Sequence, residues 1–279
     1  MNIYKSFHAP LLAVLAALLA LTACKGDDPM LTPPIKPAIL PTLPSGSNAA
    51  LKSTQHNGSI NDCYDWTLNY GDNRLMSASG SRRSNNPAGD YGYSYSLTLT
   101  YDSKGVAIAH SDGNAISVQL DSNNHITAMQ YGTNAYAFGY AGNRMSCWQK
   151  TETTNSLGQI KQYTSKGEFI YNAAGDLVYI LYTDTWGNQT EITLTPSAMA
   201  NTNGLLPETI ATEMGIDGFE ALYYAGLLGA PSPHLTQTIS KKAKGSEEAE
   251  TTDFIYTQRG GNTELCTYKN GSVAVNYGY

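Results

Sequence analysis

The sequence predicts a mainly β protein: a curled antiparallel meander sheet of about twelve strands, with a short helical segment packed on its apolar face. Three observations predict this fold class. Apolar and polar residues alternate along most of the chain, as in strands with one buried face. Clusters of Gly, Asn and Asp separate the alternating runs. The run-ending residues Tyr101, Leu120 and Tyr140 are 19 and 20 residues apart, about the length of one hairpin.

The first 23 residues predict a lipoprotein signal peptide. Lys5 supplies a basic start, and an uninterrupted apolar run of 11 residues extends from Leu11 to Leu21. A membrane-spanning helix needs about 20 apolar residues, so this shorter run predicts a cleaved signal. A Leu-Thr-Ala sequence stands directly before Cys24 and matches the lipobox of bacterial lipoproteins. We therefore expect Cys24 to become the acylated, palmitate-bearing first residue.

Residues 24–60 predict an acylated Cys followed by a proline-rich tether. The stretch from Lys25 to Asp28 resembles the acidic surface-export signal of Bacteroidota lipoproteins. Six of the 12 prolines lie between Pro29 and Pro44. Such a composition favours an extended polyproline II spacer at about 3.1 Å per residue. These features predict a lipid-anchored outer-membrane protein on the cell surface, with the periplasmic face as the alternative.

Residues 61–279 predict a single β-rich domain built from hairpin repeats. The first strand runs from Tyr64 to Tyr70, and the clearest runs from Tyr91 to Tyr101, where Tyr and Leu alternate with Gly, Ser and Thr. Later strands are predicted at Ile116–Leu120, Tyr136–Tyr140, Leu177–Tyr182 and Val273–Tyr279. The turn at Gly71–Asn73 is typical of a hairpin join. Residues 77–90 predict a long polar loop, to which the sequence assigns no role.

Residues 207–228 are predicted to be the only strongly helical region. A Pro-Glu pair opens the segment, and Asp217 with Glu220 forms a pair like a capping box. Apolar residues then recur at helical spacing from Phe219 onward. A helix this apolar is expected to pack against the sheet.

The composition excludes one class of partner and explains most of the aromatic residues. Charged residues make up 14% of the chain, against about 25% in an average soluble domain. The formal net charge is −6 without a large Lys/Arg cluster, so nucleic-acid binding through bulk charge is excluded. Tyr supplies 20 of the 28 aromatic residues. Most of them alternate in step with Leu and Val, which predicts that they pack the sheet.

The cysteines give no metal site. Once Cys24 is acylated, Cys63, Cys147 and Cys266 remain, an odd number that allows at most one internal disulfide. Whether any of the three pair stays open. They form no C-x-x-C motif and have no nearby His at metal-ligand spacing, so we expect neither a metal nor a cofactor.

No catalytic motif is present, and we expect no catalytic residue. The patterns of serine hydrolases, zinc proteases and nucleotide-binding enzymes are all absent. The histidines stand in unrelated contexts: His56, His110, His125 and His234. Most carboxylates considered stand at strand ends or in turns, where Asp is ordinary turn chemistry: Asp62, Asp65, Asp102, Asp121, Asp176 and Asp184. A glycosidase pair about 5–9 Å apart is the alternative.

Two tryptophans are candidate ligand contacts because they depart from the packing pattern. Trp186 lies in what reads as a hairpin tip, Thr183–Asn188. Trp148 has the opposite parity to Met145 and Cys147, which predicts that its indole faces away from the packed side. An exposed indole is a suitable surface for stacking on a sugar ring; loop packing is the alternative.

The lipobox, the Tyr-rich repeat units, the helix after Phe219 and the closing two-strand segment 253–279 together resemble a family of unknown function. It is the domain family numbered four-five-nine-five, found among secreted lipoproteins of Bacteroidota. The resemblance covers most of the chain after residue 61. It implies a curled antiparallel sheet with helices against its concave face, and it implies no established activity or catalytic residues. The longer loop at 77–90 departs from the family pattern.

Taken together, these features predict a non-enzymatic binding module for an extracellular ligand, most plausibly a glycan, on a lipid-anchored envelope protein. The expected partners are the membrane, through the lipid, and a glycan or an envelope protein. A structural role in the envelope is one alternative, and a glycan-active hydrolase is the other.

Overall fold

The computed structural model describes residues 50–58, 63–83, 93–103, 105–156 and 159–279. The predicted signal peptide, the acylation site Cys24, the proline-rich stretch and Asp62 lie outside the described residues. Within the described ranges, no helix combines the length and the apolar character needed to cross a membrane.

Seventeen strands and one short α-helix form the regular structure of the described residues, so the expected number of about twelve strands is too low. The elements are β1 Ser53–Gly58, β2 Cys63–Gly71, β3 Arg74–Arg83, β4 Tyr93–Asp102, β5 Gly105–His110, β6 Ala115–Leu120, β7 Ile126–Tyr131, β8 Asn134–Ala141, β9 Arg144–Ser156, β10 Gln159–Tyr171, β11 Leu177–Thr183, β12 Gln189–Ala200, α2 Glu220–Tyr224, β13 His234–Ala243, β14 Glu250–Asp253, β15 Ile255–Arg259, β16 Asn262–Tyr268 and β17 Val273–Gly278.

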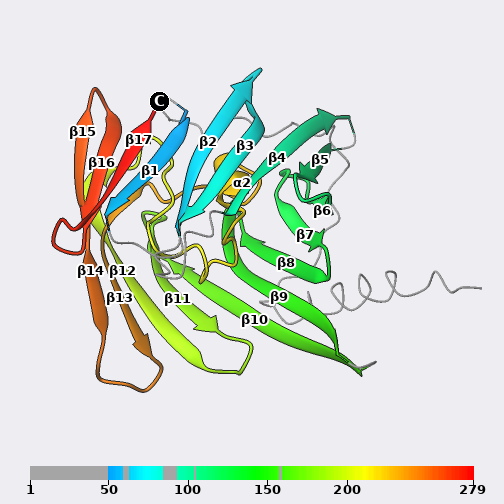
Figure 1. Cartoon of the computed structure of the whole chain (residues 1–279). Helices are drawn as coiled ribbons and strands as arrows, with labels where there is room; N and C mark the ends of the chain where they lie inside the picture. The colour runs from blue at the N-terminus through cyan, green and yellow to red at the C-terminus, as the bar shows by residue number, and fades with distance from the viewer. Residues whose placement is uncertain (1–49, 59–62, 84–92, 104, 157–158) are drawn as a thin grey trace, which may run out of the picture.

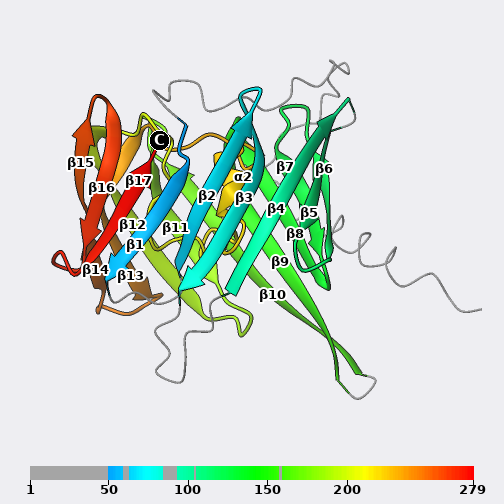
Figure 2. The same ribbon diagram turned by 45° about the horizontal axis from the view of Figure 1, so that its top comes forward.

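The strands follow one another in a single antiparallel sheet that curls until its ends meet, which confirms the predicted curled meander. β14 pairs with β13 and β15 pairs with β16, and only Phe254 separates the two strands along the chain. β1 pairs with β17 over six residues, from Ser53 opposite Gly278 to Gly58 opposite Val273. The result is a nearly closed barrel (Figures 1 and 2). β1 lies in the segment expected to be tether, so the sheet begins before residue 61.

Alternation and turn chemistry account for the strands that the sequence predicts. In β4, Leu97 and Leu99 are buried while Thr98 and Thr100 are exposed. The hairpin between β2 and β3 turns at Asp72 and Asn73, both of which have positive φ. Two successive residues with positive φ match the twist of the flanking strands.

The predicted loop at 77–90 is wrong over its first part, because residues 77–83 belong to β3. Residues 84–90 lie outside the described chain. Leu75 and Ala78 of β3 are buried, but the next inward position is Gly80, which has no side chain to continue the apolar pattern. A Cβ atom on Gly80 would lie 3.0 Å from the ring of Trp66 in β2. Trp66 therefore supplies the apolar cover at Gly80.

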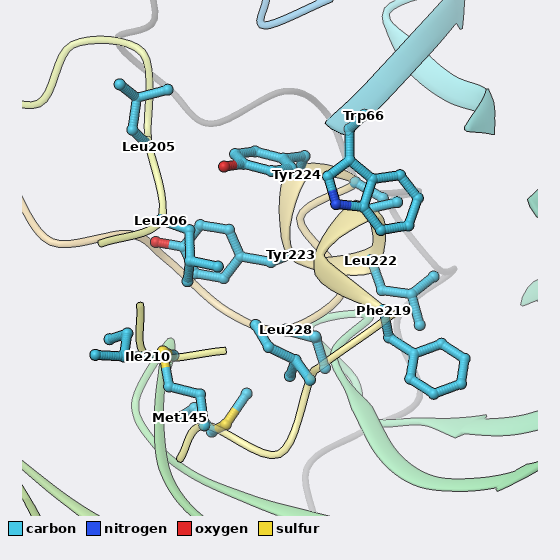
Figure 3. Packing of buried hydrophobic residues seen from close by; sticks show 14 of the residues in the cluster. Trp66, Met145, Leu205, Leu206, Ile210, Phe219, Leu222, Tyr223, Tyr224 and Leu228 are labelled. Carbon is cyan, nitrogen blue, oxygen red and sulfur yellow. The ribbon is translucent and has the colours of Figure 1, made fainter. Parts of the chain in front are cut away.

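The barrel interior is filled by residues 201–233, which connect β12 to β13 and are called the inner segment here (Figure 1). Barrels of 16–18 strands are too wide to be filled by their own side chains. The inner segment supplies the missing apolar volume through many buried residues, among them Leu205, Leu206, Ile210, Ile216, Phe219, Leu222, Leu227 and Leu228. In Figure 3, Phe219, Leu222 and Tyr223 spread from the helix toward the surrounding segments.

The predicted helix over 207–228 is mostly wrong: only α2, five residues long, is an α-helix. Turns form the rest, with positive φ at Gly215, Gly218 and Gly226. The predicted capping pair is absent too, because the N-cap is Phe219 and no side chain caps it. Packing against the apolar face of the sheet is confirmed, since all five residues of α2 are buried.

The inner segment enters and leaves through one end of the barrel. The backbone N–H of Asn201 donates to the carbonyl of Pro233 (2.7 Å), and the Asn201 side-chain amide donates to the carbonyls of Leu205 and Ser232. Paired strands are antiparallel, and β14 and β15 run in the same direction on either side of Phe254. The connections from β1 to β2, β11 to β12 and β16 to β17 therefore all lie at the other end. We call this the open end.

Candidate functional site

A cavity of about 280 Å³ lies between the inner segment and the wall formed by β1, β2, β13, β14 and β16. Lys269 and Glu250 on its outer side are exposed and stand at connections of the open end, whereas His56 and Glu220 on its inner side are buried. The cavity therefore opens to solvent at the open end. It is called the interior pocket below.

His56 of β1 lies in the pocket wall between two carboxylates. Its Nδ1 is 3.0 Å from Oδ1 of Asp65, and its Nε2 is 3.1 Å from Oε2 of Glu208. Burial by itself would lower the pKa of His56, but the charge of Glu208 and the hydrogen bond to Asp65 outweigh it and raise the pKa to about 12. Both ring nitrogens therefore carry a proton, and the ring has no lone pair for a general base or a metal.

Glu208 connects the closing seam of the barrel to the inner segment. One of its oxygens faces His56 of β1, and the hydroxyl of Tyr277 in β17 donates to the other at 2.8 Å. Cys63 also contacts His56 by a side-chain hydrogen bond. The fold thus places Cys63 beside a histidine, but that histidine is already protonated and held by carboxylates. Such a histidine cannot take the thiol proton, as a cysteine hydrolase would require.

Among the described residues, Cys63, Cys147 and Cys266 form no disulfide. Burial raises the pKa of the Cys266 thiol well above its usual range, and the charge of Glu208 adds to the rise. Among the described residues, no group of three or more His, Cys, Asp or Glu side chains is arranged to hold a metal ion.

Glu220, the first residue of α2, is a buried acid in the same pocket, with 7% of its surface exposed. Burial is the main reason that its pKa rises to about 8; backbone N–H groups of Glu220 and Gly218 oppose the rise, and the charges of Asp217 and Glu208 add to it. Its Oε2 atom has no hydrogen-bond partner among the described residues. At neutral pH this carboxyl group is mostly protonated.

Two further pocket residues carry buried polar atoms without a partner. Across the described chain, six buried side-chain atoms lack a hydrogen bond, and three of them belong to pocket residues: Trp66 Nε1, Glu220 Oε2 and Tyr268 OH. Tyr64 adds an aromatic face next to Trp66, at 5.8 Å between ring centroids. Buried polar groups are normally satisfied, so three unsatisfied atoms on residues that line one cavity make this cavity the candidate binding site.

The two tryptophans predicted as ligand contacts lie outside the pocket. Trp148 is only 2% exposed, and its Nε1–H donates to the carbonyl of Glu213 at 2.8 Å. The parity argument failed because β9 has a bulge: Gly139 pairs with Cys147 and Tyr140 pairs with Met145, which leaves one extra residue between them. After that residue, Trp148 and Met145 both belong to the buried core.

Trp186 is 73% exposed in the turn between β11 and β12, at the open end. The carboxylate of Asp184 accepts hydrogen bonds from the backbone N–H groups of Trp186 and Asn188, which holds the turn. Tyr163 of β10 meets the indole edge to face at 6.1 Å between centroids. Its role as a ligand contact stays a prediction.

Three of the six aspartates considered from the sequence shape turns. Asp102 accepts the backbone N–H of Gly105, Asp121 accepts that of Asn123, and Asp184 acts as described above. Sequence reasoning missed His56 because it stands in the expected tether, and missed Glu208 and Glu220 because they read as helix-starting residues. One signal was available: Glu208 and Glu220 stand in an otherwise apolar segment, where an acid is expected to be buried.

Comparison with known proteins finds a similar fold but no matching family. No family model matches the sequence, and no curated protein matches it either. A porin-like protein from Bacteroides uniformis is similar in structure, with a TM-score of 0.60 and 20% identity over 82% of this chain and 97% of that chain. A porin-like protein from Bacteroides vulgatus gives a TM-score of 0.47 and 9% identity over 83% and 99%. The first likeness shows that both chains share a large curled β-sheet fold.

Proposed function

We propose that this protein is a lipid-anchored envelope protein that binds one small sugar unit in the interior pocket and acts as a binding module. The observation that carries the proposal is the set of three orphan polar atoms on Trp66, Glu220 and Tyr268 around one cavity. An unsatisfied buried polar group costs about 1–3 kcal/mol, so a ligand that pairs with all three would gain affinity from each.

The chemistry of these atoms favours a sugar. Trp66 Nε1 needs an acceptor, Tyr268 OH can donate or accept, and the protonated Glu220 can do the same. Sugar hydroxyl groups supply both functions on neighbouring carbons, and the half-buried ring of Tyr64 adds an aromatic surface. The cavity of about 280 Å³ lies near the lower end of the 300–1,000 Å³ typical of small-molecule sites, which suits one sugar unit.

The envelope part of the proposal is supported by the sequence before residue 50 and by the outer wall. The lipobox at Cys24 provides an anchor, and the proline-rich tether provides a spacer. In β4 the exposed residues Thr98 and Thr100 carry hydroxyl groups, whereas a lipid-facing wall needs an apolar band. This polar part of the wall suits a domain held in water by a lipid tether.

A glycoside hydrolase is the second candidate, favoured by Glu220. A carboxyl group that stays protonated at neutral pH, close to Asp217 in a pocket, is the kind of group that acts as a general acid. Binding is favoured over hydrolysis because both oxygens of Glu208 are already bonded to His56 and Tyr277. A hydrolase must also hold sugars on both sides of the bond that it cleaves.

The test uses the three indole N–H signals of the full-length, ¹⁵N-labelled protein in detergent. A panel of monosaccharides is titrated, and the signals are assigned with Trp66→Phe. A bound sugar should move the Trp66 signal saturably, whereas the Trp148 signal should stay because that N–H is already bonded to Glu213. No movement of Trp66 with any sugar contradicts the proposal. Release of reducing ends from oligosaccharides, lost in Glu220→Gln, would replace it by hydrolysis.

A further inference from the structure

We infer that the interior pocket selects a ligand carrying a protonated amine, such as an amino sugar, and that the ammonium group binds against Glu220. This inference rests on the proposed function, because it names the chemical class that the same pocket prefers. The observation behind it is that Oε2 of Glu220 has no hydrogen-bond partner among the described residues. The cations on the inner side of the cavity, His56 and Lys241, are bonded to other carboxylates.

One oxygen of the Glu220 carboxyl group has no partner among the described residues. The backbone N–H groups of Gly218 and Glu220 bond to the carboxyl group, and Oε2 receives no hydrogen bond from the described residues. Glu220 lines the cavity and is more than nine-tenths buried. A carboxyl oxygen in this position can accept a charge-assisted hydrogen bond from a ligand ammonium group, which is stronger than a bond from a neutral hydroxyl.

The cations near the cavity are held by other partners. His56 is bound by Asp65 and Glu208. The ammonium group of Lys241 is 2.6 Å from Oε1 of Glu213, and it also donates to the carbonyl of Thr209. Lys269 stands on the exposed outer side of the cavity. None of these contacts places a protein cation on Glu220.

The groups that surround Glu220 are acids and phenols. Asp217 and Glu208 of the inner segment raise its pKa through their charges. The phenols of Tyr64 in β2, Tyr95 in β4 and Tyr224 in α2 also interact with its charge, and Arg82 of β3 lies over the Tyr64 ring at 5.7 Å. The charges of Asp217 and Glu208 would attract an ammonium ligand, while a neutral sugar would gain nothing from them.

Binding of an amine should release a proton. The ammonium group stabilises the carboxylate form of Glu220, whereas the free pocket holds that carboxyl group protonated at neutral pH. Amine affinity should therefore rise about tenfold for each pH unit from pH 5.5 to 7, as the cost of removing the Glu220 proton falls. Neutral sugars need no such proton release, so their affinity should stay constant over the same range.

The experiment compares glucosamine, N-acetylglucosamine, glucose and cyclohexylamine by calorimetry on the full-length protein at pH 5.5, 6.3 and 7. The first three probes differ only in the amine, and the last carries the amine without a sugar. The variants are Glu220→Gln, which keeps the shape of the side chain, and Glu250→Gln, which changes an exposed acid of the same cavity. A thermal melt of each variant reports whether it is folded.

Glucosamine should bind at least tenfold more tightly than glucose at pH 7, with the stated pH dependence. Glu220→Gln should abolish both the preference and the pH dependence, while Glu250→Gln should change neither. Equal, pH-independent binding of glucosamine and glucose would overturn this inference and leave the proposed function standing. Binding of cyclohexylamine without any sugar would support the amine site and contradict the glycan class. Failure of all four probes would contradict both.

Discussion

At the scale of single residues, His56 is the point where the barrel seam and the inner segment meet. It lies on β1 and contacts Asp65 of β2 and Glu208 of the inner segment, while Tyr277 of β17 contacts the same Glu208. Removing one member of a buried charge network leaves the remaining charges without compensation. The network therefore makes closure of the barrel depend on one imidazolium group.

Replacing His56 by Asn should lower the free energy of unfolding by about 3–5 kcal/mol at pH 7, because Asp65 and Glu208 lose their cation. The raised pKa of His56 means that its stabilising contribution is complete below pH 6.5 and disappears as the pH rises toward 12. Urea unfolding of both proteins should show a difference that shrinks from pH 7 to pH 10. Adding Glu208→Gln should recover part of the loss. A loss below 1 kcal/mol at pH 7 would contradict the role of the network.

Glu220 should have the opposite effect on stability, since it is a buried acid with a raised pKa. Its folded form keeps a proton that the unfolded form gives up above pH 4.5, so the protein loses stability as the pH rises from 4.5 to about 8. Glu220→Gln removes this loss. The variant should melt at nearly the wild-type temperature at pH 4.5 and at a higher temperature at pH 8. The same difference in melting temperature at both pH values would rule out a raised pKa.

Trp186 tests whether the outer rim of the open end also contacts a glycan. Trp186→Ala should change stability by no more than about 0.5 kcal/mol, because the indole is 73% exposed. It should weaken retention of the protein on polysaccharide affinity gels. Ile255→Ala is the matched control, since Ile255 is an apolar residue of β15 that is 69% exposed. Unchanged retention of the Trp186 variant would remove this residue from the glycan hypothesis.

At the scale of elements, the inner segment is held to the wall by a close approach between Gly215 and Trp148. A Cβ atom at Gly215 would lie 2.3 Å from the indole, and Gly215 has a φ of +70°. A side chain here would have to push the indole away and break its bond to Glu213. The inner segment is therefore positioned by backbone contact as much as by its apolar side chains.

Gly215→Ala should lower the free energy of unfolding by much more than the strain of a non-glycine residue at positive φ alone. Gly245 separates the two effects, because it has a φ of +84° and nothing within 4 Å of an added Cβ. Gly245→Ala should cost about 1 kcal/mol, and Gly215→Ala should cost at least about 3 kcal/mol more in urea unfolding. Equal costs would show that the packing against Trp148 is unimportant.

The elements also show where prediction from the sequence succeeded. Strands such as β4, which carry their own apolar residues on one face, were predictable from alternation alone. The second part of β3 was missed because Gly80 has no side chain and Trp66 of the neighbouring strand β2 covers it. Trp148 was predicted on the wrong face because one extra residue in β9 shifts the alternation. The sequence predicted a helix longer than the five-residue α2, because helical spacing of apolar residues also arises in buried turns. In each case the deciding contact comes from another segment.

At the scale of the whole molecule, the predicted anchor is tested by location in the cell. Cys24→Ala removes the only residue that the lipobox can acylate, so the protein should move from the membrane fraction to the soluble fraction. Metabolic labelling with palmitate should be lost in parallel. Protease treatment of intact cells distinguishes the cell surface, where the wild-type domain is cleaved, from the periplasmic face, where it is protected. Membrane retention of the variant would contradict lipid anchoring.

The pocket could not be predicted at this scale, because its residues come from distant parts of the chain. His56 and Glu208 are 152 residues apart, and Tyr95 bonds to the carbonyl of Gly218 across 123 residues. Hairpin patterns describe neighbouring strands only. They do not say that a connecting segment turns inward, nor that the first described strand meets the last.

The pairing of β1 with β17 has a consequence for how the chain folds. Most neighbouring strands are linked by short connections, and β12 and β13 by the inner segment, but this seam joins residues 53–58 to residues 273–278. Contacts of such large separation form slowly, because the chain entropy of closing the loop must be lost first. Until β17 arrives, β1 and β16 present unpaired edges, which are templates for pairing with another chain. A newly made copy is therefore most exposed to strand exchange and aggregation in the interval before its last strand closes the seam.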